Sequence, residues 1–259
     1  MLKLEYFARE REQIILRMLK EKRRITVSEL SELFETSGTT IRRQLREMEQ
    51  AGLLIRTHGG AISMEEASME RSLETKTGHQ TLEKQAIARE ARRHVEDGDI
   101  LMLGGGTSVV EFAKLLHDAR NLIVITNSLP VAAELYPQKD IEVQICGGAI
   151  REKSGVVIGP SAVRFLEELS AVKTFVGADS ISIKYGITTP NSFEAEIERM
   201  LIERGKTVFV LADSTKMDKI TLARQSPLDT INCIITDANI NPGFREKLTA
   251  AGVKVIIAK

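Results

Sequence analysis

The chain has 259 residues, of which 42% are hydrophobic and 28% charged, with 36 basic and 36 acidic side chains. These values predict a folded protein of one large or two unequal domains and exclude a disordered chain. No apolar run approaches the 18 or so residues of a membrane helix, and no secretory leader is visible. We therefore expect a cytoplasmic protein with no membrane partner, in which Cys146 and Cys233 are buried thiols.

Residues 1–63 predict three short helices followed by a β-hairpin. The segment Thr26–Glu29 fits a capping box that opens the second helix, Ser37 can cap the third, and Gly52 can end it. The hairpin, 53–63, turns at two glycines, of which one is expected to need a positive φ. The apolar side chains expected to face inward are Ile14, Ile15, Met18, Leu19, Leu30, Leu33, Phe34, Ile41, Leu45 and Met48. This order of elements is typical of a winged helix-turn-helix.

The third helix has a basic outer face. Between residues 39 and 46 there are three arginines and no acidic residue. Basic side chains also outnumber acidic ones in the N-terminal part of the chain. Arginine and threonine side chains can bind guanine or phosphate. A solvated helix face is the alternative for an isolated Arg-Arg pair, but the helix-turn-helix context favours DNA. The candidate DNA-binding residues are Ser37, Thr39, Thr40, Arg42, Arg43, Arg46, His58 and Gly59.

After a polar segment, 64–80, which we interpret as a linker, residues 81–259 alternate between apolar strands and helical patterns. The strands are expected at 100–104, 122–127, 142–148, 173–179, 207–213, 233–237 and 253–258. Helical patterns are expected at 109–117, 163–169, 193–203 and 242–251. Such alternation predicts an α/β domain with a largely parallel sheet.

Several loops after these strands carry groups suited to an anion and a polyol. The first is a glycine turn in which backbone N–H groups, hydroxyls and a helix N-terminus converge. It matches neither the dinucleotide fingerprint nor the GxxxxGK[ST] phosphate loop. A purely structural turn is the alternative, but ligands of open α/β sheets bind where such loops gather. The candidate ligand-binding residues are Gly105, Gly106, Thr107, Ser108, Asn127, Ser128, Arg151, Asp179 and Lys216.

The chain resembles the DeoR family of bacterial transcriptional repressors. In the first domain the resemblance rests on TIRRQL (40–45), EMEQAGLLIR (47–56) and HGGA (58–61). In the second it rests on GGGTS, TNSLP, GGAIR, GADSI, GITTP, EAEIE and LADSTK, in family order. The resemblance implies that the third helix enters the major groove and that the second domain is similar to ribose-5-phosphate isomerase.

The same resemblance implies roles for single residues of the second domain. A phosphate would lie on Gly106, Thr107 and Ser108, with Asn127 and Ser128 nearby, and Asp179 and Lys216 would face the sugar. The chain departs from the family pattern at four positions: Gly38, Gln44 in place of an acid, Gly104 in place of Asp, and Glu198 in place of Lys. The last two departures concern the sugar end of the site.

We therefore predict a repressor of a sugar-metabolism operon, acting as a homo-oligomer on double-stranded operator DNA and controlled by a phosphorylated sugar. No cofactor, metal or catalytic residue is expected. The alternative is a sugar-phosphate isomerase with an accessory DNA-binding domain, using Asp179, Glu194 and Lys216. The missing carboxylate at Gly104 weakens that alternative. Whether the regulator represses or activates depends on the operator position and stays open.

Overall fold

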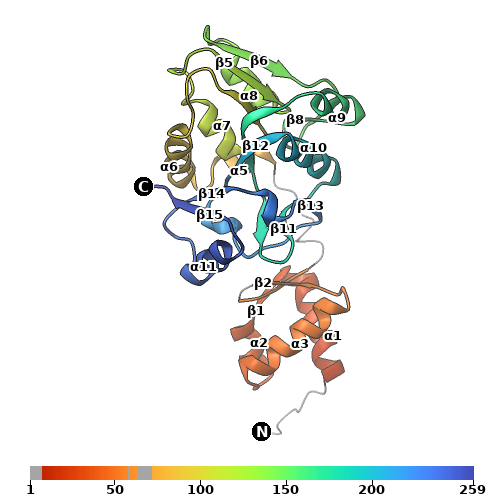
Figure 1. The fold of residues 1–259 in the computed structure, drawn as a ribbon. Coiled ribbons are helices and arrows are strands. Elements are labelled where there is room, and N and C mark those ends of the chain that lie inside the picture. Colours follow the sequence, from red (N-terminus) through yellow and green to blue (C-terminus); the bar gives the residue numbers. More distant parts are fainter. Residues whose placement is uncertain (1–7, 58, 64–71) are drawn as a thin grey trace. The chain divides into compact units, whose positions relative to one another are not determined.

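The computed structural model describes residues 8–57, 59–63 and 72–259, and it divides the chain into two compact units, Met1–Met69 and Glu70–Lys259 (Figure 1). A helix, α5 (Leu73–Thr77), begins the described part of the second unit, where the amide of Leu73 donates to the carbonyl of Lys153 at 2.7 Å. The predicted linker 64–80 is therefore too long at its C-terminal end. Its residues 64–71 lie outside the described residues.

The first unit contains the three predicted helices and the hairpin. Threonine 26 and Glu29 form the predicted capping box, Ser37 caps the third helix, and Gly52 follows that helix with φ +71°. Most of the predicted inward-facing side chains are buried in one cluster, but Leu33 is 47% exposed. The elements are α1 (Ala8–Lys22), β1 (Arg24–Thr26), α2 (Val27–Leu33), α3 (Gly38–Gln50), β2 (Ile55–Thr57) and β3 (Gly60–Ile62).

The hairpin is part of a three-stranded antiparallel sheet of order β1-β3-β2. The strand β1 was not expected from the sequence. Its pairing explains Gly60, which lies opposite Thr26: a Cβ atom on Gly60 would lie 1.9 Å from the carbonyl oxygen of Ile25. Gly60 is not among the residues with positive φ. At Gly60, therefore, close backbone approach and not a left-handed φ requires the glycine.

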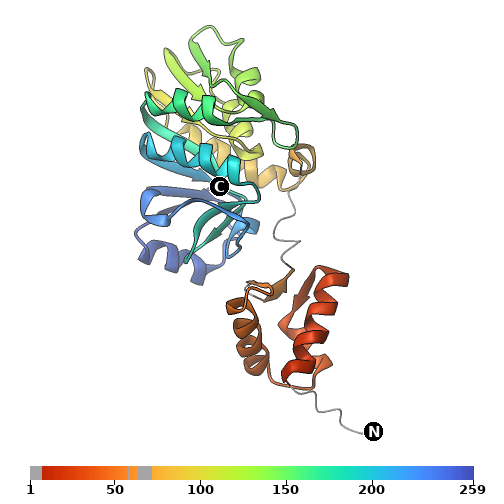
Figure 2. The ribbon, with the colours of Figure 1, turned by 90° about the vertical axis from the view of Figure 1, so that its right-hand side faces the viewer.

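The second unit is built on a seven-stranded sheet in which every pair of neighbours is parallel (Figures 1 and 2). Its order is β15-β14-β12-β9-β4-β5-β6. The strands are β4 (Ile100–Leu103), β5 (Leu122–Thr126), β6 (Ile141–Ile145), β9 (Ala171–Gly177), β12 (Gly205–Leu211), β14 (Cys233–Thr236) and β15 (Lys254–Ile257). These are the seven strands that the apolar runs predict, so the prediction of a largely parallel sheet is confirmed.

Helices cover both faces of this sheet (Figure 1). Side chains alternate along β4: Leu101 and Leu103 belong to the buried cluster that includes residues of α6, α7 and α8, whereas Met102 belongs to the cluster that includes residues of α9, α10 and α11. The helices are α6 (Thr81–Arg92), α7 (Thr107–Ala113), α8 (Leu129–Leu135), α9 (Pro160–Glu167), α10 (Ser192–Glu203) and α11 (Pro242–Ala250). Both sides of the sheet are therefore buried, and Cys146 and Cys233 are buried free thiols in these two clusters, as expected.

Five further strands lie outside the main sheet and were not expected from the sequence. They form a β7-β8 hairpin and a small sheet of order β10-β11-β13, which packs against α10. They are β7 (Ala149–Arg151), β8 (Val156–Ile158), β10 (Ser180–Ser182), β11 (Gly186–Thr189) and β13 (Ala223–Ser226). No helix within the described residues is long and apolar enough to cross a membrane.

Candidate functional site

The outer face of α3 carries the basic residues that the sequence analysis singled out. Because Ile41, Leu45 and Met48 are buried, Thr39, Arg42, Arg43 and Arg46 are left exposed on the other side. Arg43 has one weak neighbour, the exposed carboxylate of Glu47 at 4.0 Å, one turn further along the helix. Exposed ion pairs of this kind contribute little to stability, so the guanidinium group of Arg43 is available to bind a phosphate or a DNA base.

Two of the predicted DNA-binding residues, Ser37 and Thr40, have a structural role at the start of α3. The amide of Thr40 donates to Oγ of Ser37 at 3.3 Å, and the two hydroxyl oxygens lie 3.0 Å apart. These bonds satisfy an otherwise unpaired amide of the first helical turn. Both side chains still border the exposed face, since Ser37 is exposed and Thr40 half-buried.

The family departure at Gln44 faces inward. Gln44 is 6% exposed and accepts a hydrogen bond from Nε of Arg11 on α1 at 2.8 Å. An acid at this position would make the same contact as an ion pair, so the departure concerns packing between α1 and α3. In the hairpin, Gly59 is exposed, whereas His58 lies outside the described residues.

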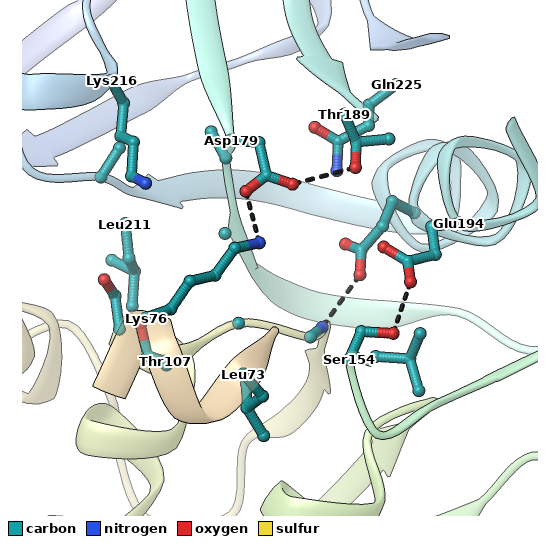
Figure 3. Close-up of a pocket in the computed structure, with 18 of the residues that line it drawn as sticks. Leu73, Lys76, Thr107, Ser154, Asp179, Thr189, Glu194, Leu211, Lys216 and Gln225 are labelled. Carbon is teal, nitrogen blue, oxygen red and sulfur yellow. Dashed lines mark hydrogen bonds and ion pairs between the residues drawn. The ribbon is translucent and has the colours of Figure 1, made fainter. Parts of the chain in front are cut away.

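The second unit has a cavity where the chain changes direction along the sheet. From β4 the chain proceeds through β5 and β6 to one edge, and then returns to β9, on the other side of β4, and continues to the opposite edge. The connections that follow β4 and β9 therefore lead to helices on opposite faces of the sheet, α7 and α10, and open α/β sheets form ligand sites at such a point. The cavity is lined at this point by Gly105, Gly106, Thr107 and Ser108 after β4, and by Asp179 after β9 (Figure 3).

Glycines allow these two loops to meet. A Cβ atom on Gly177 would lie 2.8 Å from the carbonyl oxygen of Gly105, and the Cα of Gly177 lies 3.7 Å from the Cβ position of Gly106. Gly106 has φ +110° and is the N-cap residue of α7. A side chain on either residue would separate the loops or strain the turn, so these glycines shape the cavity.

Six of the nine predicted ligand-binding residues line the cavity: Gly105, Gly106, Thr107, Ser108, Asp179 and Lys216. The other three do not. Asn127 and Ser128 are fully buried after β5, where Ser128 caps α8. Arg151 donates from Nε to Glu194 at 2.8 Å and therefore holds a lining residue in place. The sequence indicated that these three residues follow a strand or a glycine turn. It did not indicate which way their side chains point.

Glu194, named above for the isomerase alternative, and Glu198, named as a family departure, also line the cavity. Further lining residues were not expected from the sequence: Lys76, Lys84, Lys153, Ser154, Thr189, Asp213 and Gln225. Lys76 comes from α5, in the segment interpreted as a linker, and its Nζ lies 2.5 Å from Oδ1 of Asp179 (Figure 3). Thr189 donates to the other carboxylate oxygen of Asp179 at 3.0 Å. No local pattern connects these residues, because they come from α5, the end of β9 and β11.

Four lysines line the cavity: Lys76, Lys84, Lys153 and Lys216. Lys84 is buried and donates from Nζ to the carbonyl oxygens of Lys76 and His79, and burial lowers the pKa of its ammonium group. The side chain of Lys216 points toward the cavity, and its ammonium group has no hydrogen-bond or ion-pair partner among the described residues (Figure 3). The described residues include no group of three or more His, Cys, Asp or Glu that could hold a metal ion.

The family departures at Gly104 and Glu198 meet in one place. A Cβ atom on Gly104 would lie 2.4 Å from Oε2 of Glu198, and the amide of Gly105 donates to Oε1 of Glu198 at 2.9 Å. A carboxylate is thus present beside Gly104, contributed by α10. The sequence analysis counted a missing carboxylate at Gly104 against the isomerase alternative. Because Glu198 supplies a carboxylate there, this argument is wrong. Burial raises the pKa of Glu198 to about 8.

Two family models match the chain. The "DeoR-like helix-turn-helix domain" matches residues 11–67, and the "DeoR C terminal sensor domain" matches residues 79–238. Among curated proteins, the chain is 35% identical to the uncharacterized HTH-type transcriptional regulator YulB of Bacillus subtilis, over 95% of each chain. It is 31% identical to the HTH-type transcriptional regulator GlpR of Haloferax volcanii, over 95% of this chain and 96% of that protein. It is 32% identical to a putative aga operon transcriptional repressor of Escherichia coli O157:H7, over 96% and 93%.

Likeness to solved structures is weaker. A D-ribose-5-phosphate isomerase in complex with phospho-erythronic acid has a TM-score of 0.39 and 19% identity over 52% of each chain. The Pyrococcus horikoshii translation initiation factor eIF-2B has a TM-score of 0.42 and 15% identity over 88% of this chain and 86% of that one. These values carry no argument about function. The two matched domains and the full-length similarity of the curated relatives show the family: the chain belongs to the DeoR family of transcriptional regulators.

Proposed function

We propose that this protein is a repressor of a sugar-metabolism operon whose operator affinity changes when a phosphorylated sugar binds in the second unit. The observation that carries the proposal is the cavity between the loops after β4 and β9. Its lining combines lysines and the backbone amides of the glycine turn with carboxylate, hydroxyl and amide side chains. Such a mixture suits a ligand that carries both a phosphate and hydroxyls.

Operator binding is assigned to α3. Its exposed residues Arg42, Arg43 and Arg46 can form bidentate bonds to guanine or pair with phosphates, and Thr39 lies at the exposed start of the helix. One helix-turn-helix contacts too few base pairs for firm specificity, so we expect a homo-oligomer that binds repeated or palindromic half-sites.

The phosphate of the effector is assigned to the turn of Gly106, Thr107 and Ser108. Two hydroxyls and the amides of the turn can donate to it, and Lys216 contributes a positive charge from the opposite wall. Because the ammonium group of Lys216 has no ion-pair partner among the described residues, an incoming phosphate does not have to displace one. The loops that follow β4 and β12 would then be joined by the ligand.

The sugar end of the ligand would act on α5 through Asp179. Both oxygens of this carboxylate are engaged, one by Lys76 of α5 and the other by Thr189. A sugar hydroxyl that takes the place of Lys76 on Asp179 would remove an ion pair that holds α5 to the rest of the second unit. In the chain, α5 follows the segment that connects the two units. Effector and operator would thus be coupled, typically by about 1–3 kcal/mol.

The test combines a ligand screen with DNA binding. Phosphorylated pentoses and hexoses are screened by thermal shift on the full chain, since a ligand at 100 times its Kd adds about 2.7 kcal/mol of stability. The compound found is then added to complexes of the protein with DNA selected from a random-sequence library. We expect one class of sugar phosphate to stabilise the protein and to change its DNA affinity. Stabilisation without any change in DNA affinity would contradict the proposed coupling.

The screen also decides the enzymatic alternative. Asp179, Glu194 and Glu198 supply carboxylates in the cavity, so the geometry by itself does not exclude proton transfer to a bound sugar. Since the relatives are named transcriptional regulators, we expect no isomerase turnover of any compound that binds. Aldose-to-ketose conversion by the purified protein, abolished by Asp179→Asn, would overturn this part of the proposal.

A further inference from the structure

Gln225 is a buried polar residue in the wall of the cavity. It lies on β13, is 5% exposed, and lines the cavity together with Thr189 and Asp179 (Figure 3). Neither polar atom of its side-chain amide makes a hydrogen bond to a described residue: Oε1 is enclosed by the protein without a partner, whereas Nε2 is not enclosed. Because the side chain lines the cavity, the amide nitrogen is the atom that a ligand can reach.

An irregularity in the pairing of β11 with β13 directs this side chain. Ile187 of β11 pairs with Ser226. The next residue, Thr188, pairs with Arg224, so Gln225 is left over between the two pairs, as in a β-bulge. Consecutive residues of a regular strand point to opposite faces, but Gln225 and Ser226 are both buried. Bulges are common next to binding sites because they turn one side chain out of the regular alternation.

This arrangement costs stability in the ligand-free protein. A buried amide oxygen without a hydrogen bond has lost its bonds to water and has gained none within the protein. An unbranched apolar side chain of similar length, such as methionine, would avoid that cost. Natural proteins keep such costs mainly where a residue serves binding or catalysis, so the amide of Gln225 is better explained by a ligand than by the fold.

The neighbours of the amide indicate which group it binds. Residue 225 follows Ala223, which pairs with Thr189, and Thr189 donates to the carboxylate of Asp179 at 3.0 Å. The amide nitrogen can only donate a hydrogen bond, whereas a carboxylate can only accept one. A hydroxyl group satisfies both, because its oxygen accepts from Gln225 while its hydrogen is donated to Asp179. A phosphate has no hydrogen bond to give to a carboxylate once it is fully ionised.

We propose that Gln225 is a specificity-determining residue of the cavity, and that its Nε2 donates to a hydroxyl oxygen of the effector beside Asp179. The inference rests on the proposed function, because it takes the ligand to be a phosphorylated sugar. It goes further by stating what the cavity selects: a sugar phosphate that keeps this hydroxyl is preferred over the deoxy analogue that lacks it. Since the phosphate is assigned to the glycine turn, Gln225 does not contribute to the affinity for phosphate itself.

The first measurement needs no ligand. Gln225→Met keeps the length of the side chain and removes both polar atoms of the amide. The melting temperature of the second unit in the full-length variant should therefore be at least that of wild type, and up to about 2–4 °C higher. A lower melting temperature would mean that the amide makes bonds on which the fold depends, and it would overturn the inference.

The second measurement compares ligands by calorimetry on the full-length protein. A panel of pentose and hexose phosphates, including ribose 5-phosphate, glucose 6-phosphate and fructose 6-phosphate, is followed by the monodeoxy analogues of the compound that binds most tightly, with inorganic phosphate as the reference. Wild type should bind one analogue about tenfold or more weakly than its parent, and Gln225→Met should bind the parent about tenfold more weakly than wild type does. Combining the variant with that analogue should cost less than the two losses added together.

The matched control is Arg224→Met, at the exposed neighbouring position of β13, which should bind every probe as wild type does. Wild-type affinity of Gln225→Met for the parent sugar phosphate, or strictly additive losses, would overturn the role of Gln225 and leave the proposed function standing. Weaker binding of inorganic phosphate by Gln225→Met would also overturn it, since it would show a distorted cavity. If the wild-type protein binds no sugar phosphate of the panel, the proposed effector class fails and the inference fails with it.

Discussion

Replacing Glu198 with glutamine is expected to change how the stability of the second unit depends on pH. Burial, with a contribution from Glu194 and Asp179, raises the pKa of Glu198 from 4.5 to about 8. Glutamine has nearly the same shape, keeps an oxygen that can accept the amide hydrogen of Gly105, and does not titrate. The difference in stability between the variant and the wild-type protein therefore isolates this one group.

The sign and size follow from the two pKa values. The folded protein keeps the Glu198 proton up to a pH of about 8, whereas the unfolded chain releases it near the ordinary value of 4.5. The stability that the group contributes is thus fully present below pH 4.5 and is lost as the pH rises toward 8. At about 1.36 kcal/mol for each pKa unit, the whole difference amounts to roughly 5 kcal/mol. The Glu198→Gln variant should nearly match wild type at about pH 5 and exceed it by a few kcal/mol at about pH 8.5.

Hydrogen exchange measured by mass spectrometry gives the assay. Peptides that cover β9 and β12 report the free energy of unfolding of the second unit separately from the first. Exchange is compared for wild type, Glu198→Gln and the exposed control Glu196→Gln at several pH values, with the intrinsic rates taken into account. A difference between Glu198→Gln and wild type that stays constant with pH would refute the reasoning, as would a variant that loses stability relative to wild type as the pH rises.

Four further changes test the two sites. Arg43→Ala should weaken operator binding by about 1–3 kcal/mol in a gel-shift titration at fixed salt without affecting folding, because the side chain is exposed; unchanged affinity would remove this residue from the interface. Gly60→Val should disrupt the pairing of β1 with β3 and abolish DNA binding while effector binding measured by calorimetry persists, and loss of both activities would show that the two units are not independent. Lys216→Ala should weaken effector binding more at low salt than at high salt, and salt-independent loss would mean that its charge does not face the phosphate. Gly104→Ala should lower the melting temperature, and the same change combined with Glu198→Ala should cost less than the two single effects added together, with a coupling of about 0.5–3 kcal/mol; strict additivity would contradict the contact between the two residues.

Local sequence patterns determined the main elements of both units. The seven strands of the parallel sheet were predictable because each contains a short apolar run, and the central ones are buried on both faces, which requires no knowledge of their neighbours. The same holds for α3, whose apolar stripe and Ser37 cap set its inner face and its first residue. Since its exposed arginines follow from that stripe, the candidate DNA-binding face was also predictable. The motifs of the family then pointed to the loops after β4 and β9.

The tertiary structure decided what depends on residues far apart in the chain. The segment Arg24–Thr26 is a strand only because β3 pairs with it, and α5 has no apolar stripe of its own that distinguishes it from a linker. The contact between Gly104 and Glu198 is the clearest case: the hydrogen bond beside it joins residues 93 positions apart. Each residue alone is a departure from a family pattern. Their relation follows from the packing of α10 against β9, the neighbour of β4, which brings a carboxylate to a glycine that no local pattern connects with it.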